Sequence, residues 1–328
     1  MLAQDLQALA HFADDKKRYP ALETLFFRGY QFRVESEDPD RFRLQMFGLD
    51  PHDELPIASL SRAADQGENP GQNQYWIRLD PVTLRADMAS VVMTSHGFAD
   101  LDEVERKEIE NVVRAVLSGE SLVLRSENPE RWYLALDEPL EFCFTPLGDA
   151  LGMDISEFLP EHAEFLSWRR IMNEIQIALH ASTVNVRRRQ NGQQTINSFW
   201  FWGGGFIPVA DKQGVFNTVY SDNPVTRGLA IINDYRLGTQ TAAEETKFDQ
   251  DGQSVLVDWT VGSRDAKQEL NRLEFFVKRL LGEVRAGSIE LVFYSGRSEG
   301  WRYGRSSGMR FWRYRQPLSK ISFTSLPA

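Results

Sequence analysis

This chain of 328 residues has little of the chemistry that most metal and redox sites need. It contains a single cysteine, Cys143, which excludes a disulfide within the chain and any site built from several cysteines. Because Cys143 lies in the apolar run Phe142–Phe144, we expect a packed core thiol. Only five histidines are present, and none follows His180. A metal site in the last third would need carboxylates alone, which can still hold magnesium.

Long apolar runs and excess positive charge are also missing. No window approaches about 18 uninterrupted apolar residues, so we expect no membrane-spanning helix. The first 20 residues carry early acidic side chains and no apolar segment of signal-peptide length, which favours a cytoplasmic protein. The net charge of −10 argues against nucleic acid or a membrane surface as the main partner.

The stretch NSFWFWGGG, Asn197–Gly205, combines a strand pattern with three glycines. A phosphate-binding P-loop would place lysine and Ser or Thr after the last glycine, whereas here Phe206-Ile207-Pro208 follows. A dinucleotide fingerprint would open a helix at the glycines, and Pro208 disfavours one. A loop that lines a site and a purely structural turn remain as alternatives.

Strands and helices alternate along most of the chain, which predicts an α/β protein with a largely parallel sheet. Polar loop residues 63–74 are the best candidate domain boundary. The apolar spacing predicts strands at 75–79, 197–202, 215–220, 254–259 and 288–294, and helices at 1–20, 102–118, 160–180 and 227–235. It also predicts a long helix with an apolar face from Leu270 to Val284 that ends at Gly287.

Two basic segments are candidate anion sites. Residues 185–194 read as a polar connector in which Arg188 and its neighbours could clamp a phosphate or a carboxylate, or could simply be solvated. His180 would cap the preceding helix. Residues 297–320 hold seven basic side chains and interleaved aromatics. That pattern is typical of a half-buried edge strand, RFWRYR, and also of a surface that stacks on single-stranded nucleic acid.

Several stretches resemble, in combination, one bacterial family. They are DPVTLRAD (Asp80–Asp87), NPERWYLAL (Asn128–Leu136), WRRIMNEIQIALH (Trp168–His180), Asn185 with Arg188 and Gly192, INSFWFWGGG (Ile196–Gly205), SDNPVTRGLA (Ser221–Ala230) and RFWRYRQPL (Arg310–Leu318). Over about residues 60–320 the chain is similar to the RpfE-type bacterial regulatory proteins, often labelled cofactor-independent phosphoglycerate mutase. Where that family often carries HxHPxN, this chain has Ser182 and Thr183.

The resemblance extends, more distantly, to the archaeal-type cofactor-independent phosphoglycerate mutases. It implies an alkaline-phosphatase-like α/β fold, with a mainly parallel core sheet flanked by helices and an inserted smaller α+β domain. The implied core is residues 1–70 plus 195–328, and the implied lid-like insertion is residues 75–190. The three glycines would then lie where the insertion returns to the core.

Those mutases hold two metals with an N-terminal aspartate and C-terminal Asp and His ligands, and use a serine nucleophile. The corresponding late segment here, Phe293–Gly304, has no Asp-His pair. We therefore expect no cofactor, and a catalytically degenerate regulatory protein that binds an anionic or phosphorylated small molecule or a protein partner. An active metal-dependent mutase or phosphohydrolase, and a docking module that uses the basic C-terminal tail, are the alternatives.

The residues that we expect to bind the ligand share a polar side chain or an open glycine backbone. They are Arg85, Asp87, Asn173, His180, Asn185, Arg188, Asn197, Gly203, Gly204, Gly205, Asp222 and Arg227.

Overall fold

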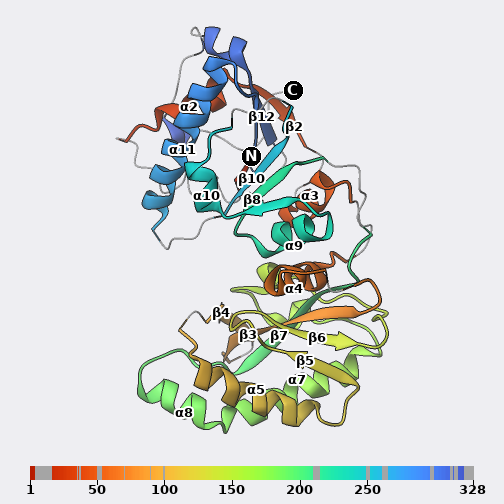
Figure 1. The fold of residues 1–328 in the computed structure, drawn as a ribbon. Helices are drawn as coiled ribbons and strands as arrows, with labels where there is room; N and C mark the ends of the chain where they lie inside the picture. Colours follow the sequence, from red (N-terminus) through yellow and green to blue (C-terminus); the bar gives the residue numbers. More distant parts are fainter. Residues whose placement is uncertain are drawn as a thin grey trace. The chain divides into compact units, whose positions relative to one another are not determined.

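The computed structural model divides the chain into two compact units (Figure 1). Unit 1 comprises residues 1–50 and 210–328, and unit 2 comprises residues 51–209. The residues described are 1–3, 17–34, 36, 38–49, 54–69, 71–88, 90–98, 100–209, 215–248, 252–260, 265–295, 299–310, 313 and 317–320.

Unit 1 is built on a mixed seven-stranded sheet in the order β2-β12-β11-β1-β10-β8-β9. The pairs β11–β1, β1–β10, β10–β8 and β8–β9 are parallel, whereas β12 is antiparallel to both of its neighbours. The strands are β1 (Leu2–Ala3), β2 (Tyr30–Arg33), β8 (Thr218–Ser221), β9 (Arg236–Gly238), β10 (Val255–Trp259), β11 (Leu291–Tyr294) and β12 (Glu299–Tyr303).

Helices cover both faces of this sheet. They are α2 (Pro20–Arg28), α3 (Pro39–Met46), α9 (Pro224–Ile232), α10 (Gln240–Glu245) and α11 (Ala266–Ala286), with short 3-10 turns at Arg305–Met309 and Leu318–Lys320. Because side chains alternate along a strand, Trp259 and Phe293 pack against α11 and α2, whereas Asp258 and Tyr294 face α3 on the opposite side. The predicted end of α11 is confirmed, since Gly287 adopts the left-handed conformation there (φ 84°).

Unit 2 is built on an antiparallel five-stranded sheet, in the order β4-β3-β6-β5 with β7 also paired to β3. Its strands are β3 (Tyr75–Ala86), β4 (Val91–His96), β5 (Leu122–Arg125), β6 (Trp132–Leu136) and β7 (Ser198–Gly205). The helical elements are α4 (Ile57–Gln66), α5 (Glu103–Leu117), α6 (Leu147–Ala150), a 3-10 turn (Ile155–Phe158), α7 (Phe165–His180) and α8 (Thr183–Gln190).

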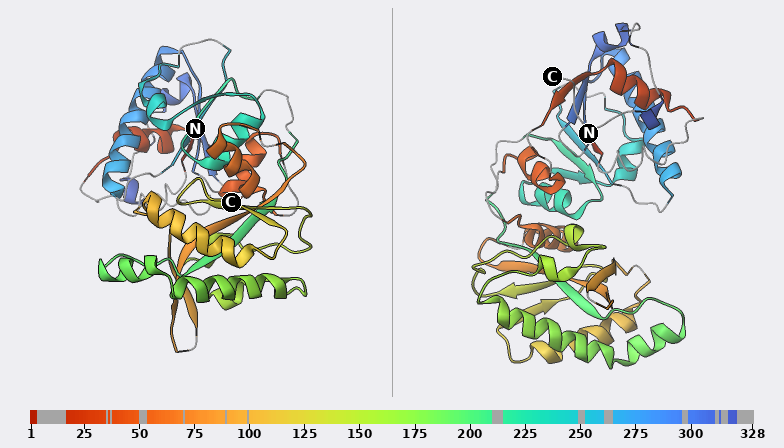
Figure 2. Two further views of the ribbon diagram at one scale, coloured as in Figure 1. Left: turned by 60° about the horizontal axis from the view of Figure 1, so that its bottom comes forward. Right: turned by 180° about the vertical axis from the view of Figure 1, so that it is seen from behind.

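The two faces of the unit 2 sheet differ in chemistry. On one face, Ile77 and Leu79 join a large apolar core with α5 and α7, which lie side by side (Figures 1 and 2). On the other face, Trp76 packs with Ala58 of α4, and the alternate position on β3 is Arg78. The core of unit 2 therefore lies between the sheet and the α5–α7 layer.

The mixed α/β class is confirmed, but the sheets differ from the expected one. Among the described strands, parallel pairs occur in unit 1 only, where β12 is antiparallel to both of its neighbours. The expected strand 197–202 exists as β7, yet it pairs with β3 in unit 2 and not with the strands of unit 1. Pairing partners depend on residues more than a hundred positions away, which strand periodicity does not encode.

Three local expectations were wrong. Residues 185–190 of the expected connector belong to helix α8, because the Ser182 hydroxyl accepts a hydrogen bond from the Asn185 N–H and caps the helix. The expected loop at 63–74 begins inside α4. Cys143 is exposed, whereas Phe144 beside it is buried, so the core thiol expected there is a surface thiol. The expected helix 1–20 and the RFWRYR strand fall largely outside the described residues.

Candidate functional site

The structure distributes the predicted ligand-binding residues over both units. Asp222 and Arg227 belong to unit 1, and the other ten belong to unit 2. Four of those ten are exposed: Arg85 and Asp87 at the end of β3, and Asn173 and His180 on α7. The rest are engaged in contacts within the chain.

Arg188 is fully buried, and its guanidinium is bonded on three sides. Its Nη1 donates to Glu105 Oε2 at 2.6 Å, and its Nη2 donates to Asp100 Oδ2 at 2.8 Å. Its Nε donates to the Gln194 carbonyl at 2.6 Å, and the ring of Phe98 lies 5.7 Å from the guanidinium carbon. These contacts fasten α8 to the beginning of α5.

Two of the predicted asparagines act as backbone bridges. Asn185 is buried, donates to the carbonyls of Leu179 (2.9 Å) and Ile196 (2.7 Å), and accepts from the Ile196 N–H (3.0 Å). Asn197 pairs with the backbone of Leu84, accepting from its N–H and donating to its carbonyl, both at 2.7 Å. Each side chain satisfies backbone groups where regular strand or helix pairing stops.

The three glycines at the end of β7 allow residues 54–57 to pass unusually close to the strand. A Cβ on Gly203, whose φ is 66°, would lie 2.9 Å from Ile57 Cβ, and one on Gly205 would lie 2.6 Å from Pro56 Cβ. Real Cβ atoms do not approach carbon this closely, so each position requires glycine. The glycine run is therefore a crossing point of two chain segments.

Glu54 uses the backbone N–H groups of that crossing. Its Oε1 accepts a hydrogen bond from the Gly204 N–H at 2.8 Å. Burial raises the pKa of the Glu54 carboxyl to about 7, against the lowering effect of hydrogen bonds from Gly204, the Cys143 thiol, and the backbone of Gly203 and Phe144. The donors that the sequence suggested for an external anion thus already serve a carboxylate of the chain.

Gly205→Ala is expected to destabilise the protein by about 1–3 kcal/mol, because its Cβ would overlap the Cβ and Cα of Pro56. Gly282→Ala is the matched control. Gly282 lies inside α11 with open space around its position, so alanine there should stabilise by roughly 0.4–1 kcal/mol. Urea unfolding of both variants measures the difference. Equal effects at the two positions would contradict the crossing-point interpretation.

A buried polar cluster lies in unit 1 at the carboxyl ends of β8 and β10. Asp258 is fully buried and accepts hydrogen bonds from Arg43 Nε (3.1 Å), Ser221 Oγ (3.2 Å) and Thr226 Oγ1 (2.5 Å). Arg43 is also buried, and its Nη1 donates to Asp40 at 2.8 Å. Although burial lowers the pKa of Arg43, the two carboxylates outweigh it and raise the pKa above its ordinary value. We call these five residues the Arg43 cluster.

The two predicted unit 1 residues flank the Arg43 cluster. Asp222 follows β8, is exposed, and accepts from the Gln240 N–H at 3.4 Å. Arg227 on α9 is half-buried and donates to the Ser221 carbonyl at 3.1 Å. The sequence interpretation found this neighbourhood but missed Arg43 and Asp258. An aspartate at the end of a buried apolar strand, VLVDW, was the available signal for Asp258.

Neither a metal cluster nor a nucleophile elbow is formed by the described residues. Among them, no three or more His, Cys, Asp or Glu side chains are grouped to hold a metal ion. A Gly-x-Ser-x-Gly pattern occurs at Gly296–Gly300, with residues 296–298 outside the described part. It connects the antiparallel strands β11 and β12, whereas a nucleophile elbow connects a strand to a helix.

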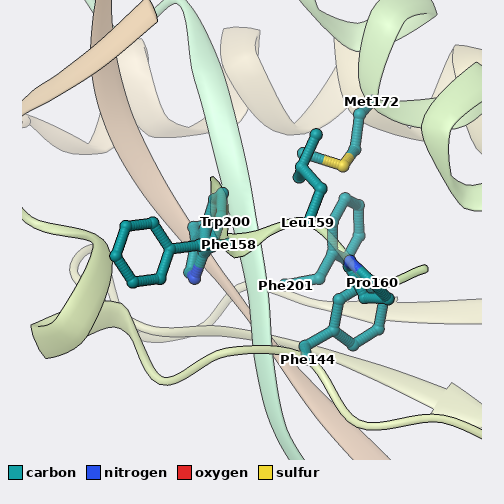
Figure 3. Close-up of a pocket in the computed structure, with 7 residues that line it drawn as sticks. All are labelled: Phe144, Phe158, Leu159, Pro160, Met172, Trp200 and Phe201. Carbon is teal, nitrogen blue, oxygen red and sulfur yellow. The ribbon is translucent and has the colours of Figure 1, made fainter. Parts of the chain in front are cut away.

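An apolar hollow in unit 2 is shown in Figure 3. Its lining is aromatic and aliphatic: Phe144, Phe158, Leu159, Pro160, Met172, Trp200 and Phe201. The hollow is too narrow for a water molecule, so it is a packing defect of the core and offers no room for a ligand. In addition, no described helix is both long and apolar enough to cross a membrane.

Comparison with known proteins shows distant homology to cofactor-independent phosphoglycerate mutases. The chain is 26% identical over 199 residues to the probable 2,3-bisphosphoglycerate-independent phosphoglycerate mutase of Geobacter sulfurreducens, which covers 58% of this chain and 49% of that protein. It is 36% identical over 91 residues to the corresponding Methanosarcina barkeri mutase, covering 26% and 23% of the two chains. The larger match thus spans about half the length of the relative, and no family model matches the chain.

The fold is similar to a solved structure from an archaeon. The PH0037 protein of Pyrococcus horikoshii superposes with a TM-score of 0.55 at 14% identity, over 92% of this chain and 87% of that one. At this identity the likeness concerns the fold alone.

Proposed function

We propose that this chain is a non-catalytic relative of the cofactor-independent phosphoglycerate mutases, with their alkaline-phosphatase-like fold. It would act as a cytoplasmic regulatory protein of the RpfE type by binding an anionic or phosphorylated small molecule. The distant homology to mutases supports the ancestry. The Arg43 cluster is the observation that carries the loss of catalysis.

The Arg43 cluster occupies the part of an α/β sheet where sites are usually built. Ligands of such sheets bind beyond the carboxyl ends of parallel strands, and β8 and β10 are parallel neighbours. Here the guanidinium of Arg43 lies between Asp40 and Asp258 and supplies the positive charge that those carboxylates require. The cluster therefore already contains an internal cation between its carboxylates.

Two-metal phosphoryl transfer does not fit this donor set. Such chemistry needs several carboxylates or imidazoles that converge on cations about 3.5–4 Å apart. Asp258 is fully buried, and both its oxygens accept bonds from Arg43, at 3.1 Å and 3.4 Å. A cation could reach Asp258 only after displacing a guanidinium that is itself buried, so we propose no metal-dependent step.

For the anionic ligand, we choose among the predicted arginines by the partners that each already has and by its exposure. Arg188 already forms ion pairs with Glu105 and Asp100. Arg85 is exposed at the end of β3, and Arg227 is half-buried beside the Arg43 cluster. Arg85 and Arg227 are therefore the guanidinium groups that we propose for anion binding, each tested separately because they lie in different units.

We expect no conversion of 3-phosphoglycerate to 2-phosphoglycerate above background with Mn²⁺ or Mg²⁺, because the Arg43 cluster excludes the metals. A coupled assay before and after chelation measures this. Isothermal titration with 3-phosphoglycerate and inorganic phosphate should show binding in the millimolar range or tighter, weakened by Arg85→Ala or Arg227→Ala. Metal-dependent turnover abolished by chelation would establish an enzyme instead, and absence of binding at millimolar concentration would refute the ligand.

A further inference from the structure

We propose that Arg62 on α4 and Arg125 on β5 form a phosphate-binding site on the face of the unit 2 sheet that α4 covers. The site takes inorganic phosphate or the phosphate group of a small molecule. It lies wholly within unit 2 and contains none of the ligand-binding residues that the sequence predicts, so it goes beyond the proposed function.

Strand register and helix packing bring the two arginines together. Arg125 is paired across the sheet with Tyr133 of β6, so their side chains lie on the same face. On that face the guanidinium carbon of Arg62 lies 4.2 Å from the centre of the Trp76 ring and 5.8 Å from the centre of the Tyr133 ring. Tyr133 is therefore the common neighbour of both arginines.

Arg62 is a buried cation without a close counterion. It is 5% exposed, and its Nε is buried with no hydrogen-bond partner. Its Nη1 lies 3.8 Å from Glu127 Oε2, too far for a hydrogen bond. Burial lowers the pKa of the Arg62 guanidinium, Glu127 opposes this effect, and Arg125 adds to it. Because buried charges in folded proteins are normally paired and hydrogen-bonded, this group of donors favours an anion.

Other carboxylates of this face are held by other arginines. Asp65 accepts a hydrogen bond from Arg131 at 2.6 Å, and Asp80 accepts one from Arg78 at 2.6 Å. Arg125 is half-buried and forms no ion pair or hydrogen bond within the part of the chain that the structure describes. The positive charge of the two site arginines is thus poorly compensated.

Two guanidinium groups and one loosely held carboxylate favour a dianion. The Glu127 side chain is 67% exposed, so it can move into water when an anion binds, and the edge of Arg62 that it faces reaches the surface. A phosphate monoester carries about −1.5 to −2 charges at pH 7, and its oxygens match the planar fork of arginine. The Trp76 ring supports the Arg62 guanidinium and so orients its donors.

The site is separate from those proposed at Arg85 and Arg227. Arg227 belongs to unit 1. Trp76, over which Arg62 lies, and Arg85 are near opposite ends of β3, about 25–30 Å apart at roughly 3.3 Å per residue. One phosphate cannot contact both, so the two proposals can fail independently.

Titration of the intact protein with inorganic phosphate tests the site. The signal is the ¹⁵N-edited NMR resonance of the Arg62 side-chain Nε–H, which is buried and is identified by its loss in Arg62→Lys. We expect phosphate to shift it in a saturable way. Arg125→Gln should weaken phosphate binding about tenfold by removing one charge-assisted contact, and Glu127→Gln should strengthen it about threefold by removing the competing carboxylate.

Arg189→Gln is the matched control, because it removes the same charge from an exposed position on α8, on the opposite side of the unit 2 sheet (Figure 1). Its phosphate affinity should equal that of the unaltered protein. Binding that survives Arg85→Ala and Arg227→Ala but weakens in Arg125→Gln would support the site. An Arg62 resonance that millimolar phosphate does not shift, or a shift unaffected by both Arg125→Gln and Glu127→Gln, would overturn the proposal.

Discussion

Arg43→Ala is expected to destabilise unit 1 by about 3–5 kcal/mol, because it leaves the buried Asp258 carboxylate without its cationic partner. The Ser221 and Thr226 hydroxyls would still donate to Asp258, but they carry no charge to offset the cost of burying it. Urea denaturation at neutral pH measures the loss as a lower transition midpoint with an unchanged slope.

The control for this variant is an exposed arginine in the same unit. Arg302 is 61% exposed and lies 3.6 Å from an equally exposed Glu290, so Arg302→Ala should change stability by less than about 1 kcal/mol. A double-mutant cycle with Asp258→Asn should show strong coupling to Arg43, since either single change leaves the other partner buried and unpaired. Additive effects would show that the Arg43–Asp258 pair is not the energetic centre of the cluster.

Arg188→Ala is expected to cost a similar amount, about 3–5 kcal/mol, through the stranded carboxylate of Glu105. Glu105 is only 8% exposed and faces Arg188 at 2.6 Å, whereas Asp100 is half-exposed and can be solvated. The loss should appear as cooperative thermal or urea unfolding of unit 2 at a lower midpoint. This result would assign Arg188 to the framework.

The neighbour Arg187 provides a matched comparison on the same helix. It is 44% exposed and pairs with the half-exposed Glu108 at 2.9 Å, so Arg187→Ala should change stability by less than about 1 kcal/mol. Arg188→Lys distinguishes the framework role from a ligand clamp, because lysine keeps the charge but loses the three-sided bonding. Reduced anion affinity in Arg188→Lys with unchanged stability would restore Arg188 as a clamp.

Two features of helix α8 were not predicted from the sequence, its helical structure and the ion pairs of Arg188, and both have the same physical cause. The segment VNVRRRQ has too few apolar residues for a helical pattern, so it reads as a connector. Its helix is held by Arg188, whose carboxylate partners lie 83 and 88 residues earlier. The same partners decide how Arg188 is used. A run of three arginines can bind an external anion or carboxylates of the chain itself. Arg188 binds carboxylates of the chain because the fold brings the beginning of α5 next to α8.

Local patterns by themselves determined the elements whose stability is local. The apolar spacing of α11 and the glycine at 287 predict that helix and its end, because helical periodicity and the left-handed conformation of glycine are local properties. The strand pattern of residues 197–202 predicts β7 for the same reason. Sequence likewise bounded the chemistry, since one cysteine and five histidines leave few ways to build a metal site.

Tertiary structure alone decided which backbone and charged groups face one another. Gly203 and Gly205 are needed because Ile57 and Pro56 cross β7, and the Gly204 N–H bonds Glu54, 150 residues earlier in the chain. Asp258 likewise meets Arg43, 215 residues away. Burial makes such long-range pairs strong by removing water, and burial is a property of the folded chain, so no local pattern around either partner contains it.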